Sequence, residues 1–216
     1  MSQFARRLGR PDRKGTPADL LVVGLGNPGE QFEGTRHNVG AAVVEELAAR
    51  ADTRLRKTKA RALAAGVLMN GKRVVLAFPQ TFMNNSGEAV KLLVQSYGIQ
   101  EAHHIIVVHD ELDLPPGEVK MKFGGGHAGH NGLRDIVAKL GSADFWRLRL
   151  GIGHPRDSAI PQQDVADYVL QPPRANESEA IAHAIDRALD AWPQIAAGDF
   201  ERAMMALHTR REQEPK

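Results

Sequence analysis

Apolar and polar positions alternate with two different periods along the chain. Residues 20–24 and 105–108 are uninterrupted apolar runs, as expected of strands buried on both faces of a sheet. Elsewhere the apolar residues recur every second position, which predicts strands, or every third and fourth position, which predicts helices. The further strands are expected at 63–69, 73–78, 118–123 and 146–152, and the helices at 41–50, 86–97, 132–140, 165–170, 177–195 and 200–208.

Turn signals separate these segments. Asn70-Gly71 stands between two predicted strands and is a strong hairpin signal. Ser86 is the expected N-cap of the helix that follows it, and Gly98 and Gly141 are expected to end two helices. Strands and helices alternate and one strand pair is antiparallel, so we predict an α/β fold. It is a single domain with a mixed twisted sheet and helices on both faces.

The composition supports one globular domain. The 216 residues are 42% hydrophobic and 25% charged, and the charges nearly cancel (28 − 26 = +2). We expect a disordered basic tail over residues 1–18, the domain over 19–209 and a short C-terminal tail over 210–216. No window of 18 apolar residues is present and no apolar run of signal-peptide length follows the basic N-terminus, so we expect no membrane association and a cytoplasmic location.

Two classes of chemistry are disfavoured by what the chain lacks. Without cysteine there is no disulfide, no cysteine-based zinc site and no thiol nucleophile. The serine elbow Gly-x-Ser-x-Gly is also absent. Direct attack by an activated water is therefore the simpler hydrolytic scheme.

The segment Gly24-Leu-Gly26-Asn-Pro-Gly29 imitates a dinucleotide-binding loop. In that motif a helix begins at the glycines and its free N–H groups meet the pyrophosphate. Here Pro28 removes one N–H and Gly34 and Thr35 delay the helix. A tight turn after a buried strand explains the glycines better, although a nucleotide site stays a minor alternative.

Polar side chains suited to catalysis follow the predicted strands. His37 precedes the first helix, and Asp110 ends an apolar strand, at the edge where α/β sheets bind their ligands. A carboxylate that accepts from one imidazole nitrogen leaves the other nitrogen to take a proton from water. Structural alternatives for the two are an exposed histidine and a turn cap.

Three asparagines occupy similar positions. Asn27, Asn84 and Asn131 lie in loops between strands and helices, where each alone could be a turn or cap residue. Amide groups can also donate to a developing oxyanion or position a water. Because loops at one edge of an α/β sheet converge, we expect these residues to meet His37 and Asp110.

Histidines near the glycine-rich loop raise the alternative of a metal site. His127 and His130 could bind zinc together with His109 or Asp110. Against this, a loop with four glycines over residues 124–130 is a poor rigid scaffold, and the glycines instead allow close approach of backbone to a ligand. We expect no metal.

Basic residues gather in two places, which indicates a phosphate-facing side. Residues 50–61 carry six positive charges and one negative, and a second group of cations lies between residues 120 and 156. Arg147 and Arg149 alternate with Leu148 and Leu150, which predicts a basic strand face opposite a buried one. Phe32 and Phe82 lie in the polar loops, where they either fill the core or stack on a terminal base.

Four motifs together resemble the bacterial-type peptidyl-tRNA hydrolase family: GLGNPGEQFEGTRHNVG, FPQTFMNNSGEAV, HDELDLPPGEVKMKFGGGHAGHNGL and RLRLGIGHP. The resemblance runs from about residue 20 to about residue 207. It implies an enzyme that cleaves the ester between a peptide and the tRNA 3′ end, without a cofactor, and that is usually monomeric. By position, His37 matches the catalytic base, Asp110 the residue that polarises it, and Asn27 the residue that recognises the peptide main chain.

The resemblance also assigns the substrate-binding positions. Asn84 and Asn131 match residues that hold substrate and water, and Phe82 matches a contact to the tRNA 3′ end. Lys120, Lys122 and Arg149 match cations near tRNA phosphates. Phe32 departs from the family, since many members carry tyrosine there; stacking survives this change but a phenolic hydrogen bond does not. Some organellar relatives only bind RNA, so a non-catalytic RNA-binding protein stays the main alternative.

Overall fold

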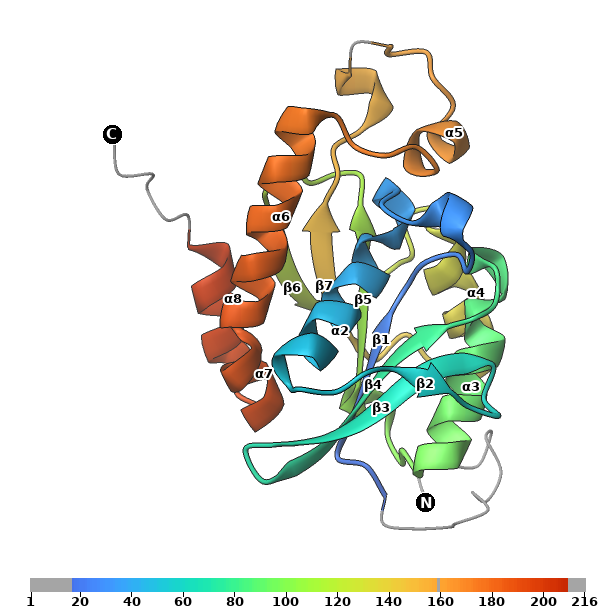
Figure 1. Ribbon diagram of the computed structural model, residues 1–216, viewed down its shortest axis with the longest axis vertical. Helices are drawn as coiled ribbons and strands as arrows, with labels where there is room; N and C mark the ends of the chain where they lie inside the picture. Colours follow the sequence, from blue (N-terminus) through green and yellow to red (C-terminus); the bar gives the residue numbers. More distant parts are fainter. Residues whose placement is uncertain (1–16, 159, 210–216) are drawn as a thin grey trace.

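The computed structural model describes residues 17–158 and 160–209, which build one seven-stranded sheet covered by helices (Figure 1). The strand order is β2-β3-β4-β1-β5-β7-β6. The predicted single α/β domain with a mixed sheet is confirmed. The strands are β1 (Leu20–Gly24), β2 (Arg56–Lys57), β3 (Ala62–Met69), β4 (Lys72–Pro79), β5 (Ile105–Glu111), β6 (Val119–Phe123) and β7 (Trp146–Gly151).

The centre of the sheet is parallel and its margins are antiparallel. β1 pairs in parallel with β4 and β5, and β5 with β7, whereas β2, β3 and β6 run antiparallel to their neighbours. The predicted hairpin joins β3 to β4. Asn70 and Gly71 both have positive φ, 49° and 75°, as the tight turn requires.

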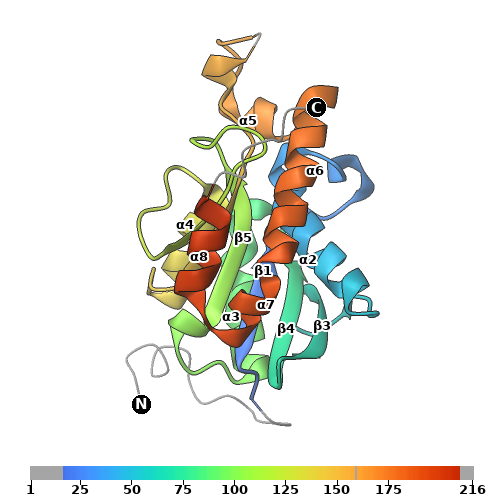
Figure 2. The same cartoon turned by 90° about the vertical axis from the view of Figure 1, so that its left-hand side faces the viewer.

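Helices cover both faces of the sheet (Figures 1 and 2). Val22 and Val108 pack toward α2, α6, α7 and α8, while their neighbours Leu21 and Val107 pack toward α3 and α4. This alternation explains why the central strands are apolar throughout. The helices are α2 (Val39–Arg50), α3 (Ser86–Tyr97), α4 (Asn131–Leu140), α5 (Val165–Val169), α6 (Ala175–Asp190), α7 (Trp192–Ala197) and α8 (Phe200–His208).

The structure differs from two of the local predictions. The single helix expected over 177–195 is divided at Ala191, because α7 begins a new first turn that accommodates Pro193. Ser86 was expected to be an N-cap, but Asn85 holds that position and the Ser86 hydroxyl donates to the Met83 carbonyl at 2.8 Å.

The chain enters the domain just before β1. Ala18 is buried and its N–H donates to the Tyr97 carbonyl at 2.8 Å. The remainder of the predicted basic tail, residues 1–16, and the predicted C-terminal tail, residues 210–216, lie outside the described residues. Among the described residues, no helix combines the length and apolarity needed to cross a bilayer.

A close approach of α2 to the sheet fixes the position of the predicted site residues. A side chain on Gly40 would clash with the Val108 carbonyl, because its Cβ would lie 2.2 Å from that oxygen. The Leu25 N–H donates to the same carbonyl, and the Ala41 N–H donates to Leu25. The start of α2 is thus locked onto the carboxyl ends of β1 and β5.

Candidate active site

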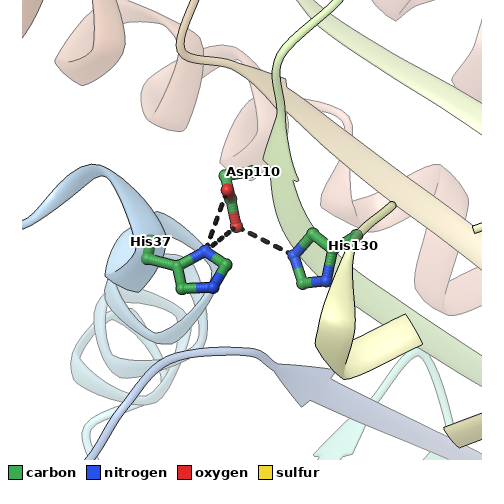
Figure 3. Close-up of side chains that lie close together, drawn as sticks. All are labelled: His37, Asp110 and His130. Carbon is green, nitrogen blue, oxygen red and sulfur yellow. Dashed lines mark hydrogen bonds and ion pairs between the residues drawn. The ribbon is translucent and has the colours of Figure 1, made fainter. Parts of the chain in front are cut away.

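His37 and Asp110 are in direct contact at this edge of the sheet (Figure 3). His37 lies in the short helical turn η2 (Arg36–Asn38) ahead of α2, and Asp110 lies in β5. The His37 Nδ1 is 3.0 Å from both carboxylate oxygens. Because a carboxylate only accepts, Nδ1 carries the proton and Nε2 presents its lone pair.

The electrostatics of the pair suit proton transfer. Burial alone would lower the pKa of His37, but the charge of Asp110 and its hydrogen bond outweigh burial and raise the pKa. Burial likewise opposes ionisation of Asp110, yet His37 and His130 hold the pKa of that carboxyl well below its usual range. The carboxylate is therefore charged at neutral pH and able to stabilise an imidazolium.

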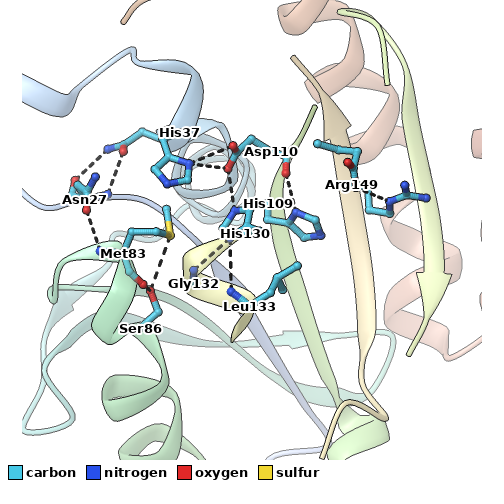
Figure 4. A network of polar contacts seen from close by, with 12 residues as sticks. Asn27, His37, Met83, Ser86, His109, Asp110, His130, Gly132, Leu133 and Arg149 are labelled. Atoms are coloured by element: carbon cyan, nitrogen blue, oxygen red, sulfur yellow. Dashed lines mark hydrogen bonds and ion pairs between the residues drawn. The ribbon is translucent and has the colours of Figure 1, made fainter. Parts of the chain in front are cut away.

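His130 completes a chain of hydrogen bonds around Asp110 (Figures 3 and 4). Its Nδ1 accepts from the N–H groups of Gly132 and Leu133 at 3.1 and 3.4 Å, so this side chain is the N-cap of α4. The proton must then be on Nε2, which donates to Asp110 at 3.0 Å. The hydrogen bond from His130 therefore helps to hold the Asp110 carboxylate in place, on the other side of it from His37.

The same three residues satisfy the proximity expected of metal ligands. One ligand atom from each of His37, Asp110 and His130 lies within 4.8 Å of the others. The hydrogen bonds do not fit a metal, however, because the His130 nitrogen that faces Asp110 carries a proton while Nδ1 caps α4. Binding an ion there would break the cap, so we derive no step through a metal.

His109 and His127 are also unsuited to the metal alternative. His109 lies outside the group of ligand atoms that come together, although its ring is 5.1 Å from that of His130 and lines the same cavity. Its Nδ1 donates to the Asp110 main-chain carbonyl at 2.7 Å, and burial, followed by the electrostatic interaction with the neighbouring His130, lowers the pKa of His109 to about 3. The His127 Nδ1 instead accepts from the Gly129 N–H in its own loop at 3.2 Å.

Asn27 is held rigidly by residues from two other segments (Figure 4). Its main-chain N–H and carbonyl pair with the Asn38 side chain, both at 2.9 Å. Its Oδ1 accepts from the Met83 N–H at 2.8 Å, which fixes the amide orientation and leaves Nδ2 as the available donor. Since the N–H of Asn27 is occupied and the helix begins only at Val39, the arrangement also argues against a dinucleotide loop.

A cavity of about 310 Å³ opens beside the pair. His37, Asp110, His130 and Asn131 line it together with the start of α5. Asn131 is exposed, and its Oδ1 accepts from Arg134 at 2.8 Å. Asn84, in the turn η3 (Met83–Asn85), is exposed and makes no side-chain hydrogen bond with a described residue. The asparagines are thus brought to one edge, although only Asn27 is buried.

Phe32 and Phe82 come together at the surface. Their rings meet edge to face with centroids 6.4 Å apart, and Phe82 is 60% exposed. Phe32 ends the short turn η1 (Glu30–Phe32) and is half-buried. An exposed phenyl ring next to polar loops is unlike core packing and offers a face on which a base could stack.

The predicted cations lie on β6 and β7, where two of them are neutralised. Lys120 pairs with Glu118 at 3.1 Å and Arg149 with Glu111 at 2.9 Å. Lys122 is exposed and forms no ion pair with a described residue. The prediction of an open basic face is wrong for Arg147, which is only 3% exposed because the glycine-rich loop covers it.

Comparison with known proteins gives a consistent result over nearly the whole chain. The sequence profile of the family described as Peptidyl-tRNA hydrolase matches residues 21–215. The chain belongs to the peptidyl-tRNA hydrolase family. The peptidyl-tRNA hydrolase of Nitrosomonas europaea is 49% identical over 193 residues, which cover 89% of this chain and 96% of that protein.

Solved structures of peptidyl-tRNA hydrolases share the fold. A complex of peptidyl-tRNA hydrolase with N-propanol superposes with a TM-score of 0.84 at 38% identity, covering 93% of this chain and all of that chain (100%). The enzyme from Acinetobacter baumannii gives a TM-score of 0.82 at 39% identity, covering 90% of this chain and 97% of that one. The family resemblance found in the sequence motifs is therefore confirmed.

The sequence interpretation missed the residues that support the site. Asn38 follows His37 directly, yet nothing in the sequence indicates that its amide would lock Asn27. His130 was considered as a metal ligand or a hydrogen-bonding group, and its function as a helix cap that donates to Asp110 was not foreseen. A histidine immediately before a predicted helix is the signal that could have suggested the cap.

Proposed function

We propose that this protein hydrolyses the ester that joins a peptide to the 3′ end of tRNA, and so recycles tRNA from peptidyl-tRNA released early from ribosomes. The observation that carries the proposal is the His37–Asp110 pair beside a cavity, in a chain of the peptidyl-tRNA hydrolase family. Peptidyl-tRNA is the partner, and neither a cofactor nor a membrane is needed. A monomer in the cytoplasm suffices for this chemistry.

His37 acts as the general base. Its Nε2 takes a proton from a water as the water oxygen attacks the ester carbonyl, and the Nδ1 proton stays on the hydrogen bond to Asp110. Asp110 keeps the imidazole in the productive tautomer and stabilises the positive charge that forms. The tetrahedral intermediate then collapses, the C–O bond to the ribose breaks, and the protonated His37 returns the proton to the leaving 3′ oxygen.

Asn27 recognises the peptide. Its Nδ2 donates to a main-chain carbonyl of the substrate, because Oδ1 is already used by the Met83 N–H. A free aminoacyl-tRNA lacks that second carbonyl, so this contact favours peptidyl-tRNA. Asn84 and Asn131 position substrate and the attacking water, and their amides can donate to the oxyanion.

The RNA occupies the outer part of the site. Phe82, supported by Phe32, stacks against the terminal nucleotides, and this contact needs no tyrosine hydroxyl. Lys120, Lys122 and Arg149 attract the phosphates of the tRNA, with Lys122 the most available because the other two are paired with carboxylates.

A matched pair of substrates and one isosteric variant test this function. The wild type should hydrolyse an N-blocked aminoacyl-tRNA and should act far more slowly on the unblocked form. Asn27→Asp keeps the acceptor for the Met83 N–H but removes the Nδ2 donor, so it should lower kcat/KM for the blocked substrate by roughly 10–100-fold. Binding of the tRNA without hydrolysis by the wild type would instead favour the non-catalytic RNA-binding alternative.

A further inference from the structure

The loop of residues 124–130, between β6 and α4, is fastened to the sheet by one buried side chain. Arg147 on β7 donates from Nη1 to the Gly126 carbonyl and from Nη2 to the Gly125 carbonyl, both at 2.5 Å. Its guanidinium carbon lies 5.0 Å from the centroid of the Phe145 ring. Two successive peptide groups are thereby held with their oxygens pointing toward the sheet.

The position of Arg147 is unusual for a residue that only packs. It is 3% exposed, forms no ion pair with a described residue, and its Nε has no hydrogen-bond partner among them. A buried cation without a carboxylate is costly unless its surroundings compensate. The two carbonyl groups compensate in part, so the cation and the loop conformation depend on each other.

The inward carbonyls determine where the amides of the loop point. All peptide bonds of the described residues are trans, so each N–H points opposite to the carbonyl of its own peptide group. The N–H groups of Gly126 and His127 therefore face away from Arg147, on the open side of the loop. Neither N–H donates to a described residue.

Positive charge gathers at the same place. Lys122 lies opposite Arg147 in the β6–β7 register, and a Cβ on Gly125 would be 2.8 Å from the Lys122 ammonium nitrogen. In this register the next cross-strand pair, Lys120 and Arg149, is neutralised by glutamates, whereas no carboxylate of a described residue pairs with Lys122 or Arg147. Glu111 acts on Arg147 electrostatically and the Asp144 carboxylate lies near Gly124, but neither forms an ion pair with Lys122 or Arg147. The loop thus combines two free amides with two cations that are outside any ion pair of the described residues, a combination suited to binding an anion.

We propose that Arg147 is a positioning residue that holds the glycine-rich loop so that the N–H groups of Gly126 and His127, together with Lys122, bind a phosphate of the substrate tRNA. The inference rests on the proposed function, because the phosphate belongs to that substrate. The loop continues directly into His130, which orients Asp110, so one segment connects phosphate binding to the catalytic pair.

The test compares two substrates with the same ester. One is an N-blocked aminoacyl-tRNA, and the other is the corresponding N-blocked aminoacyl-adenosine, which has no phosphate. The ratio of their kcat/KM values measures what the RNA phosphates contribute. Gly126→Pro removes one loop N–H and should lower this ratio about tenfold, a modest loss for a hydrogen bond to a charged group.

Gly126→Ala is the matched variant. A Cβ at this position meets no atom within 4 Å, and the N–H is retained, so the ratio should fall much less than in Gly126→Pro. Arg202→Gln removes an exposed positive charge on α8, which packs on the opposite face of the sheet, and should leave the ratio unchanged.

Variants of Arg147 test the positioning separately from the charge. Arg147→Lys keeps the charge but lacks the planar fork that reaches two carbonyls, so it should lower the ratio nearly as much as Arg147→Met. Both variants should also lose about one phosphate contact. The slope of log KM for the tRNA substrate against log salt concentration should therefore become smaller by roughly 0.7–0.9.

Three results would overturn the inference. In the first, both substrates lose activity by the same factor in Gly126→Pro and Arg147→Met, which means that the loop only supports the cavity. In the second, Gly126→Ala loses as much as Gly126→Pro. In the third, lysine at position 147 restores the wild-type ratio. Failure of the wild type to cleave either ester would contradict the proposed function itself.

Discussion

The two imidazoles that flank Asp110 differ in which nitrogen is free. In His130 both nitrogens are committed, one to the helix cap and one to the carboxylate. In His37 only Nδ1 is committed, and its side chain keeps 11% of its surface exposed next to the cavity. These hydrogen bonds therefore favour His37 over His130 as the proposed base.

Replacing Asp110 by asparagine should change both the rate and its pH dependence. The rate depends on unprotonated His37, so activity rises with pH through the pKa of His37, which Asp110 raises. Asp110→Asn removes that charge and should move the acidic limb to lower pH. The loss of the fixed tautomer should at the same time reduce kcat by roughly 10²–10⁴-fold. A pH–rate profile measured on the variant checks both effects, and an unchanged profile with an unchanged rate would remove Asp110 from the mechanism.

At the scale of elements, the site depends on how η2 is fastened. Arg36 is 4% exposed and donates to the carbonyls of Tyr168, Gln171 and Pro172, and it forms an ion pair with Glu177 at 2.5 Å. Its guanidinium also lies 4.0 Å from the centroid of the Tyr168 ring. These contacts join the turn that carries His37 to α5, which lines the cavity, and to the start of α6.

Arg36→Met should consequently destabilise the protein. The substitution leaves the half-buried Glu177 carboxylate without its ion-pair partner and removes three hydrogen bonds to carbonyl groups, so we expect a loss of about 3–5 kcal/mol in the free energy of unfolding. Chemical denaturation measures this loss. The double variant Arg36→Met/Glu177→Gln should recover part of it, since no buried charge is then left unpaired; a double variant as unstable as the single one would contradict this explanation.

The elements were largely predictable from the sequence because period and turn chemistry agree at most of them. The Leu20–Gly24 strand, the Asn70-Gly71 hairpin and the glycine ends of α3 and α4 all follow from local rules. Long-range partners were not predictable. Arg147 reads as one of a row of surface cations, and only the fold shows that the loop lies over it.

At the scale of the whole molecule, segments distant in sequence converge on one edge of the sheet. The loop after β1, the turn before α2, the end of β5 and the start of α4 each contribute one polar residue (Figure 4). This convergence is a property of parallel strands, whose carboxyl ends lie together. It explains why residues from motifs that are far apart in the sequence lie together in a single site.

From the hydrogen bonds of the site we predict that ester hydrolysis is insensitive to chelators. Each nitrogen that faces Asp110 carries a proton, so ester hydrolysis should persist after exhaustive treatment with EDTA. Assays before and after chelation, with zinc added back, check this expectation. Loss of activity that zinc restores would revive the metal-dependent alternative.

The most direct test of the account measures catalysis and binding together in His37→Ala. Hydrolysis of an N-blocked aminoacyl-tRNA should fall by roughly 10²–10⁴-fold, the usual contribution of a general base. The affinity for uncharged tRNA should stay that of the wild type, because His37 lies in the cavity and not among the exposed cations. A parallel loss of rate and affinity would make His37 a substrate contact and contradict the mechanism.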